Sequence, residues 1–147
     1  MFRPETILCP TDFSENAAYA LRVALDLARQ NRATLVLLHV ADTLGPEKLS
    51  FGEVASALQP ESHVHRLEEQ LRATVPPDAG VPVRFLLREG DPPLVIEEVV
   101  RSERCDLVVT GTHGRTGLRH LLMGSVAERI VRTAPCPVLV LKYPRPA

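Results

Sequence analysis

Five short apolar runs punctuate the chain, at residues 6–9, 34–40, 83–87, 106–111 and 137–141. Within each run apolar residues follow one another without regular polar alternation. Such strands are buried on both faces, which is typical of a parallel sheet covered by helices on both sides. The pattern therefore predicts five buried strands at these positions.

Segments with helical spacing of apolar residues separate the five runs. The predicted helices cover residues 14–29, 62–74, 92–103 and 125–133. Ser14 can cap the first helix, Pro76 and Pro77 stop the second, and Pro92 suits the first turn of the third. Strand and helix alternating at roughly 25 to 40 residues per unit predict one doubly wound α/β domain over residues 1–147. The weakest pattern, at residues 41–60, predicts a loop.

Composition narrows the class of protein further. The 147 residues carry a formal charge of -1, with 24% charged and 45% hydrophobic residues. This balance is typical of a globular protein and gives no reason to expect a nucleic-acid partner. No apolar run approaches the roughly 20 residues of a membrane span, and residues 1–4 lack an apolar signal-peptide core. We therefore expect a cytoplasmic protein with no membrane partner.

The three cysteines do not form a recognisable redox or metal motif. Cys9, Cys105 and Cys136 lie at predicted strand ends and make no CxxC pair. Buried thiols are therefore expected rather than disulfides. His63 and His65 would lie on different sides of a helix, which argues against a shared metal ion. His39 falls within a buried run and is expected to be a hydrogen-bonded core histidine.

The stretch GTHGRTGLRHLLMGSVAERIV, residues 111–131, places four glycines within fourteen residues directly before a predicted helix. Free backbone N–H groups and the positive end of a helix dipole would meet there, which favours an anion such as phosphate. The chain lacks the GxxxxGK[ST] pattern, and GTHGRTG lacks the GxGxxG spacing. An ordinary flexible connection is the alternative explanation of the glycines.

The spacing of Gly111, Gly114, Gly124 and Ser125 resembles that of the universal stress protein family, in its ATP-binding branch. Four segments match the family pattern in order: ILCPTDFSENAAYAL at 7–21, LLHV at 37–40, DLVVTGTHGRTGL at 106–118 and LLMGSVAERIVRTAPCPVLVL at 121–141. The resemblance implies a five-stranded parallel sheet in the order 3-2-1-4-5. It also implies ATP at the carboxyl edge, between the first and fourth strands.

The resemblance assigns a role to individual residues of this edge. Asp12 would accept a hydrogen bond from the ribose, Pro10 and Thr11 would shape the edge, and the backbone of Val40 would meet adenine. The phosphates would be lined by Gly111, Thr112, His113, Gly114, Arg115, Gly124, Ser125 and Val126, with magnesium held through the phosphates. Capping of the first helix is the competing role for Asp12. The contribution of Gly117 and Arg119 stays open.

The last apolar run is expected to form a dimer interface. An edge strand this apolar invites pairing with a second copy, and in the family this strand pairs across a dimer. We therefore predict a homodimer through Val138, Leu139, Val140 and Leu141.

Three functions fit the sequence. The leading one is an ATP-binding sensor or regulator of the stress response, acting on an unknown partner protein. The second is a slow ATPase or a phosphoryl or adenylyl transferase in the same cleft. No catalytic residue is predicted, because no acid or nucleophile stands beside His113 in sequence. The third is a protein-interaction module with a vestigial nucleotide site.

Overall fold

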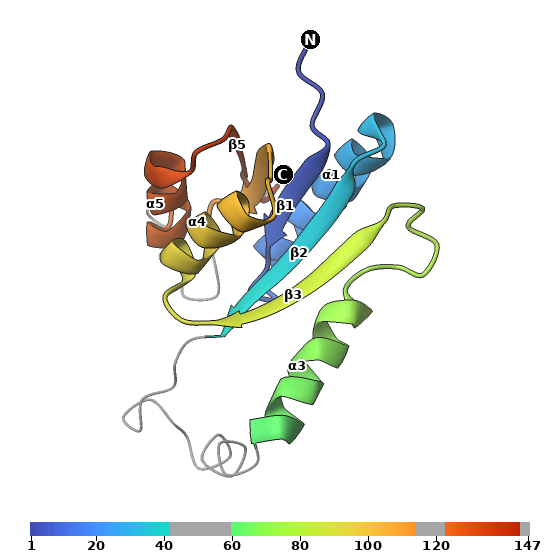
Figure 1. Cartoon of the computed structure of the whole chain (residues 1–147), viewed down its shortest axis with the longest axis vertical. Coiled ribbons are helices and arrows are strands. Elements are labelled where there is room, and N and C mark those ends of the chain that lie inside the picture. The colour runs from blue at the N-terminus through green and yellow to red at the C-terminus, as the bar shows by residue number, and fades with distance from the viewer. Residues whose placement is uncertain (42–59, 114–122, 145–147) are drawn as a thin grey trace.

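The computed structural model describes residues 1–41, 60–113 and 123–144 (Figure 1). Its strands are β1 (Thr6–Pro10), β2 (Thr34–Ala41), β3 (Val83–Glu89), β4 (Leu107–Gly111) and β5 (Val138–Leu141). Its helices are α1 (Glu15–Asn31), α3 (Pro60–Ala73), α4 (Pro92–Ser102) and α5 (Ser125–Thr133). All five predicted strands and all four predicted helices are thus confirmed. Residues 42–59, most of the predicted loop, lie outside the described residues.

The strands form one parallel sheet in the order β3-β2-β1-β4-β5, as the resemblance implied. The central strand β1 pairs with β2 over its whole length and with β4 at Ile7 and Leu8. The order reverses at β1, so the connections on its two sides leave in opposite directions. A ligand site is expected at this switch point, outside the carboxyl ends of β1 and β4.

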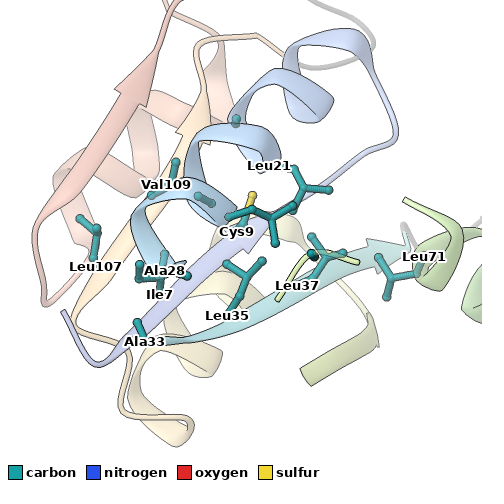
Figure 2. Close-up of a cluster of buried hydrophobic side chains, with 14 residues drawn as sticks. Ile7, Cys9, Leu21, Ala28, Ala33, Leu35, Leu37, Leu71, Leu107 and Val109 are labelled. Carbon is teal, nitrogen blue, oxygen red and sulfur yellow. The ribbon is translucent and has the colours of Figure 1, made fainter. Parts of the chain in front are cut away.

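Helices cover both faces of the sheet, and each face has its own apolar core. On the first face, α1 and α3 cover side chains of β1, β2 and β4, including Ile7, Leu35, Leu37 and Val109 (Figure 2). On the second face, α4 and α5 lie together and cover the alternate residues Leu8, Val36, Leu38 and Val108 (Figure 1). Burial on both faces explains why the sequence of these strands reads as continuous apolar runs.

The ends of the helices follow from local side-chain chemistry. Ser14 caps α1, and its side-chain oxygen accepts a 3.2 Å hydrogen bond from the backbone N–H of Ala17. The helix stops at Arg32, whose φ of 57° places it in the left-handed region. Helix α4 begins with two prolines, at positions where the backbone N–H groups have no partner within the helix.

The cysteines are free thiols, as predicted. Cys9 and Cys105 are buried, whereas Cys136 is half-buried. Burial raises the pKa of Cys9 and of Cys105 to about 12, and it also raises the pKa of Cys136. Because the thiolate is the nucleophile, none of the three thiols is activated for covalent chemistry at neutral pH.

Asp106 connects the start of β4 to the start of β1 by hydrogen bonds. Its carboxylate accepts hydrogen bonds from the backbone N–H of Glu5 at 2.8 Å and of Thr6 at 3.2 Å. Its own N–H donates to the carbonyl of Thr6 at 3.0 Å. These contacts fix the relative position of the two strands whose opposite ends form the switch point.

We expect Asp106→Ala to lower the free energy of unfolding by about 1 to 3 kcal/mol, because two charge-assisted hydrogen bonds to the backbone are lost. Urea unfolding followed by circular dichroism measures the change. Asp78→Ala is the matched control, since Asp78 is exposed on the loop after α3. Equal stability of both variants and the unaltered protein would contradict this role for Asp106.

Candidate functional site

The segment after β1 turns sharply at the carboxyl edge of the sheet. The backbone N–H of Thr11 donates to the carbonyl of Leu38 at 2.8 Å, which holds the segment against β2. Phe13 then takes a φ of 65°, a left-handed conformation that is uncommon for a bulky side chain. Strain of this kind persists only where the surrounding structure imposes it, and it is frequent at functional sites.

Asp12 supports this turn, and Ser14 rather than Asp12 is the cap of α1. A carboxylate oxygen of Asp12 accepts a 3.0 Å hydrogen bond from the N–H of Ser14. The Asp12 side chain is half-buried at the end of β1. Capping of the first helix, the competing role that the sequence allowed for Asp12, therefore belongs to Ser14.

The end of β2 lies beside this turn. Val40 is the penultimate residue of β2 and is half-buried. Its neighbour His39 makes a 2.8 Å hydrogen bond between Nδ1 and the carbonyl oxygen of Thr11, and its ring lies 4.5 Å from that of Phe13. The predicted hydrogen bond of His39 is confirmed, but the residue is half-buried and lies outside the core, where it supports the turn.

The end of β4 approaches the first turn of α1 closely. A Cβ atom added to Gly111 would lie 3.2 Å from the backbone oxygen of Asn16 and 3.3 Å from its Cβ. Contacts this short are tighter than nine in ten real Cβ contacts, so the site favours glycine. The absence of a side chain at Gly111 thus allows the end of β4 to lie close to the first turn of α1.

Gly124 places the N-terminus of α5 at the same edge. Its N–H donates to the carbonyl oxygen of Thr112 at 2.6 Å, and Thr112 in turn donates to the carbonyl oxygen of Leu141 at 3.0 Å. A Cβ atom at Gly124 would lie only 3.0 Å from the same Thr112 oxygen. Gly124 is the N-cap residue and supplies no side-chain hydrogen bond to the helix. The first turn of α5 therefore starts without the usual side-chain acceptor for its N–H groups.

His113 lies against this helix N-terminus. Its Nδ1 is 3.1 Å from the hydroxyl oxygen of Thr112, and its Nε2 is buried and has no hydrogen-bond partner among the described residues. A buried polar atom without a partner costs about 1 to 3 kcal/mol, which makes it an indicator of a missing ligand or water. The described part of the chain contains no cluster of three or more metal-ligating side chains.

The structure brings most of the predicted site residues to one edge. Pro10 ends β1 and is followed by Thr11 and Asp12, and Val40 is the penultimate residue of β2. Gly111 ends β4 and is followed by Thr112 and His113, and Gly124 is the N-cap of α5, which begins with Ser125 and Val126. Gly114 and Arg115, like Gly117 and Arg119, lie outside the described residues. Sequence reasoning missed the supporting roles of Asn16 and Leu141. For Asn16 the available signal was Gly111 at the end of a strand, because a glycine there implies that another backbone segment approaches closely.

A hollow lies away from this edge, where the end of α1 meets the N-terminal segment. It is lined by Met1, Phe2, Arg3, Gln30, Asn31 and Arg32. Its lining includes none of the glycine or carboxylate groups that make the carboxyl edge suited to a nucleotide. We therefore place the candidate site at the carboxyl edge.

Comparisons with known proteins agree with this fold. The model of the universal stress protein family matches residues 4–142. Universal stress protein MJ0531 of Methanocaldococcus jannaschii is 34% identical over 142 residues, which cover 95% of this chain and 82% of that protein.

Solved structures share the architecture. The structure of protein MJ0577 has a TM-score of 0.78 and 29% sequence identity, and the match covers 97% of this chain and 98% of that one. A universal stress protein of Arabidopsis thaliana, solved with AMP bound, has a TM-score of 0.63 and 23% identity, with 96% and 93% covered. At that identity the second likeness shows the fold alone.

Replacement of Gly124 tests the close approach at the start of α5. We expect Gly124→Ala to lower the free energy of unfolding by about 1 to 3 kcal/mol, because the new Cβ forces the Thr112 carbonyl away. Thermal and urea unfolding report the change. Ser125→Ala, at the next and exposed position, is the control and should stay within about 0.5 kcal/mol. A Gly124→Ala protein as stable as the control would refute the close approach.

Proposed function

The chain belongs to the universal stress protein family, and we propose that it binds ATP at the carboxyl edge between β1 and β4. The observation that carries the proposal is the start of α5. A glycine-capped helix N-terminus lies beside the ends of β4 and β5, and the half-buried carboxylate of Asp12 follows β1 at the same edge. A helix N-terminus attracts phosphate, whereas a carboxylate accepts hydrogen bonds from the hydroxyls of a ribose.

Each part of the site contributes to binding in a different way. Backbone N–H groups around Gly124, Ser125 and Val126 would contact the phosphates, together with the segment that begins at Gly111. Each contact of this kind contributes about 0.3 to 1 kcal/mol at exposed positions, while micromolar affinity requires about 8 kcal/mol. Ribose contacts at Asp12 and adenine contacts at the backbone of Val40 must therefore supply much of the affinity.

Magnesium would accompany ATP through the phosphate oxygens rather than through a set of protein ligands. Magnesium commonly keeps several waters and binds to the phosphates of a nucleotide. We assign Gly114 and Arg115 to the phosphate subsite as well, on the strength of the sequence pattern.

The chemistry of the edge favours binding and regulation over catalysis. Phosphoryl transfer requires a positioned nucleophile and strong charge stabilisation. The thiols are held protonated by burial, and the imidazole of His113 contacts a hydroxyl rather than a carboxylate. We infer a cytoplasmic regulator of the stress response that acts on a partner protein. Bound ATP can change the activity of such a regulator only if two conformations of the protein bind ATP with different affinities.

We further propose that β5 joins two copies of the chain. It is one of the two edge strands of the sheet, and Leu139 is 36% exposed although its neighbours in the strand are half-buried. An exposed apolar edge presents unpaired backbone groups to a second strand. Val138, Leu139, Val140 and Leu141 would form the contact of the homodimer.

Calorimetric titration of ATP and magnesium into nucleotide-free protein tests the site. We expect binding in the micromolar range and a roughly tenfold loss of affinity in Asp12→Asn, equivalent to about 1.4 kcal/mol. Asparagine keeps an oxygen for the Ser14 N–H, so the turn should survive. Asp26→Asn, the same change on an exposed position of α1, is the control and should bind as the unaltered protein does.

Mass spectrometry of the bound nucleotide separates the three functions. Intact ATP after hours of incubation supports the regulator. Sustained release of phosphate, lost when the site is altered, would establish an ATPase instead. If no nucleotide is bound and ATP gives no heat of binding, the protein-interaction module becomes the favoured function.

Light scattering coupled to size-exclusion chromatography tests the dimer. We expect Leu139→Glu to convert a dimer into a monomer, because a buried carboxylate in an apolar interface is strongly unfavourable. Leu94→Glu alters a more exposed leucine on α4 and should leave the mass unchanged. A monomeric unaltered protein, or a Leu139→Glu dimer, would contradict the proposed interface.

A further inference from the structure

Two of the three cysteines lie at the same end of two neighbouring strands. Cys105 comes two residues before β4, and Cys136 comes two residues before β5. Both side chains belong to the apolar core that α4 and α5 cover, whereas Cys9 lies in the core on the opposite face of the sheet (Figure 2). The fold thus brings together two thiols from distant parts of the sequence and keeps the third away from them.

The register of β4 and β5 sets the separation of these two cysteines. Val108 pairs with Val138 in the parallel ladder. The same register, continued two residues back, places Asp106 beside Cys136, and Cys105 is the next residue. Because neighbouring strands lie about 4.8 Å apart and successive Cα atoms about 3.8 Å apart, this arrangement corresponds to a separation of roughly 6 Å between the two cysteine Cα atoms. A disulfide usually joins Cα atoms about 4.4 to 6.8 Å apart.

The two thiols also interact electrostatically. Burial is the largest cause that raises the pKa of Cys105, and the next is the charge that Cys136 carries as a thiolate. A like charge disfavours ionisation in this way when it is close by. This effect agrees with the shared core and the strand register in making the two sulfur atoms neighbours.

The two thiols differ in their access to solvent. Cys105 is only 7% exposed, whereas Cys136 is half-buried. An oxidant in solution therefore reaches Cys136 first. Because burial keeps both thiols protonated at neutral pH and only the thiolate attacks, the reaction is slow there and its rate rises with pH.

We propose that Cys105 and Cys136 form a reversible oxidation site, at which a peroxide converts the two thiols into an internal disulfide. The thiolate of Cys136 attacks one peroxide oxygen, the O–O bond breaks, and a sulfenic acid forms while hydroxide leaves. The sulfur of Cys105 then attacks the sulfur of Cys136, and the sulfenic OH leaves as water with the proton of the Cys105 thiol. The two sulfurs supply the two electrons that reduce the peroxide. A dithiol reductant restores both thiols by exchange.

The disulfide would lie at the opposite end of the strands from the candidate nucleotide site. It would close a ring over residues 105–136, which include β4 and α5. Such a ring restricts the unfolded chain and thereby stabilises the fold. The oxidation site does not depend on nucleotide binding, and it gives the protein a separate response to oxidants.

Mass spectrometry of tryptic peptides tests the pairing in the unaltered protein. Trypsin releases Cys105 and Cys136 in separate peptides, residues 105–115 and 133–142, and Cys9 in a third. We expect hydrogen peroxide to lower the mass of the protein by about 2 Da and to link the first two peptides, while Cys9 stays a thiol. Dithiothreitol should reverse the change, and the linkage should form faster at about pH 9 than at about pH 7.

Substitutions separate the two steps of the reaction. In Cys105→Ala the reaction should stop at the sulfenic acid of Cys136, which dimedone traps, whereas Cys136→Ala should form neither product. Cys9→Ala is the matched control and should form the disulfide as the unaltered protein does. We expect the oxidised protein to unfold at a temperature about 5 to 10 °C higher than the reduced one. Disulfides between two chains, oxidation of Cys136 to a sulfinic acid while Cys105 stays a thiol, or three thiols that survive peroxide would overturn the pairing.

Discussion

The hydrogen bond from Gly124 to the carbonyl of Thr112 is the contact on which the candidate site depends. At 2.6 Å it fixes the start of α5 to the segment that follows β4. Thr112 is held in turn by the carbonyl of Leu141 at the end of β5. A Cβ atom at Gly124 would lie 3.0 Å from the Thr112 oxygen, a tighter contact than nine in ten real Cβ contacts, so glycine favours this close approach of the helix. The positive end of a helix dipole is thereby positioned beside the switch point of the sheet.

The close approach at Gly124 also separates two kinds of backbone group within the candidate site. Groups that hold the edge together are backbone groups already paired with one another, as in the contacts of Thr11 with Leu38 and of Thr112 with Leu141. The groups available to a ligand are the backbone N–H groups of the first turn of α5, which no side chain caps. Such an edge can select a nucleotide without an activated nucleophile.

Much of the fold could be predicted from the sequence because the strands are buried on both faces. Leu35, Val36, Leu37 and Leu38 are fully buried, and this burial forces the uninterrupted apolar run that marks β2. The outer strand β3 was less predictable, because exposed Arg88 and Glu89 extend it beyond the apolar run to the end of the strand. The order of the strands came from the resemblance, since periodicity alone does not determine which strands are neighbours.

The candidate site was predictable in composition but not in its supporting contacts. Glycines at 111 and 124 signalled close approach, whereas the partners of that approach, Asn16 and Thr112, depend on tertiary geometry. Local pattern also left the cap of α1 open between Asp12 and Ser14, because either side chain can accept a backbone hydrogen bond. The buried Nε2 of His113 has no sequence signal, since its lack of a partner is a property of the folded chain.

A titration of ATP and magnesium into nitrogen-15-labelled protein, followed by backbone amide NMR, tests the central claim most directly. The account predicts that the largest shifts fall on Gly111, Thr112 and His113 and on Gly124, Ser125 and Val126, with smaller ones near Asp12 and Val40. Shifts confined to another surface, such as the hollow around Phe2 and Arg32, would contradict it. So would a spectrum that ATP leaves unchanged at millimolar concentration.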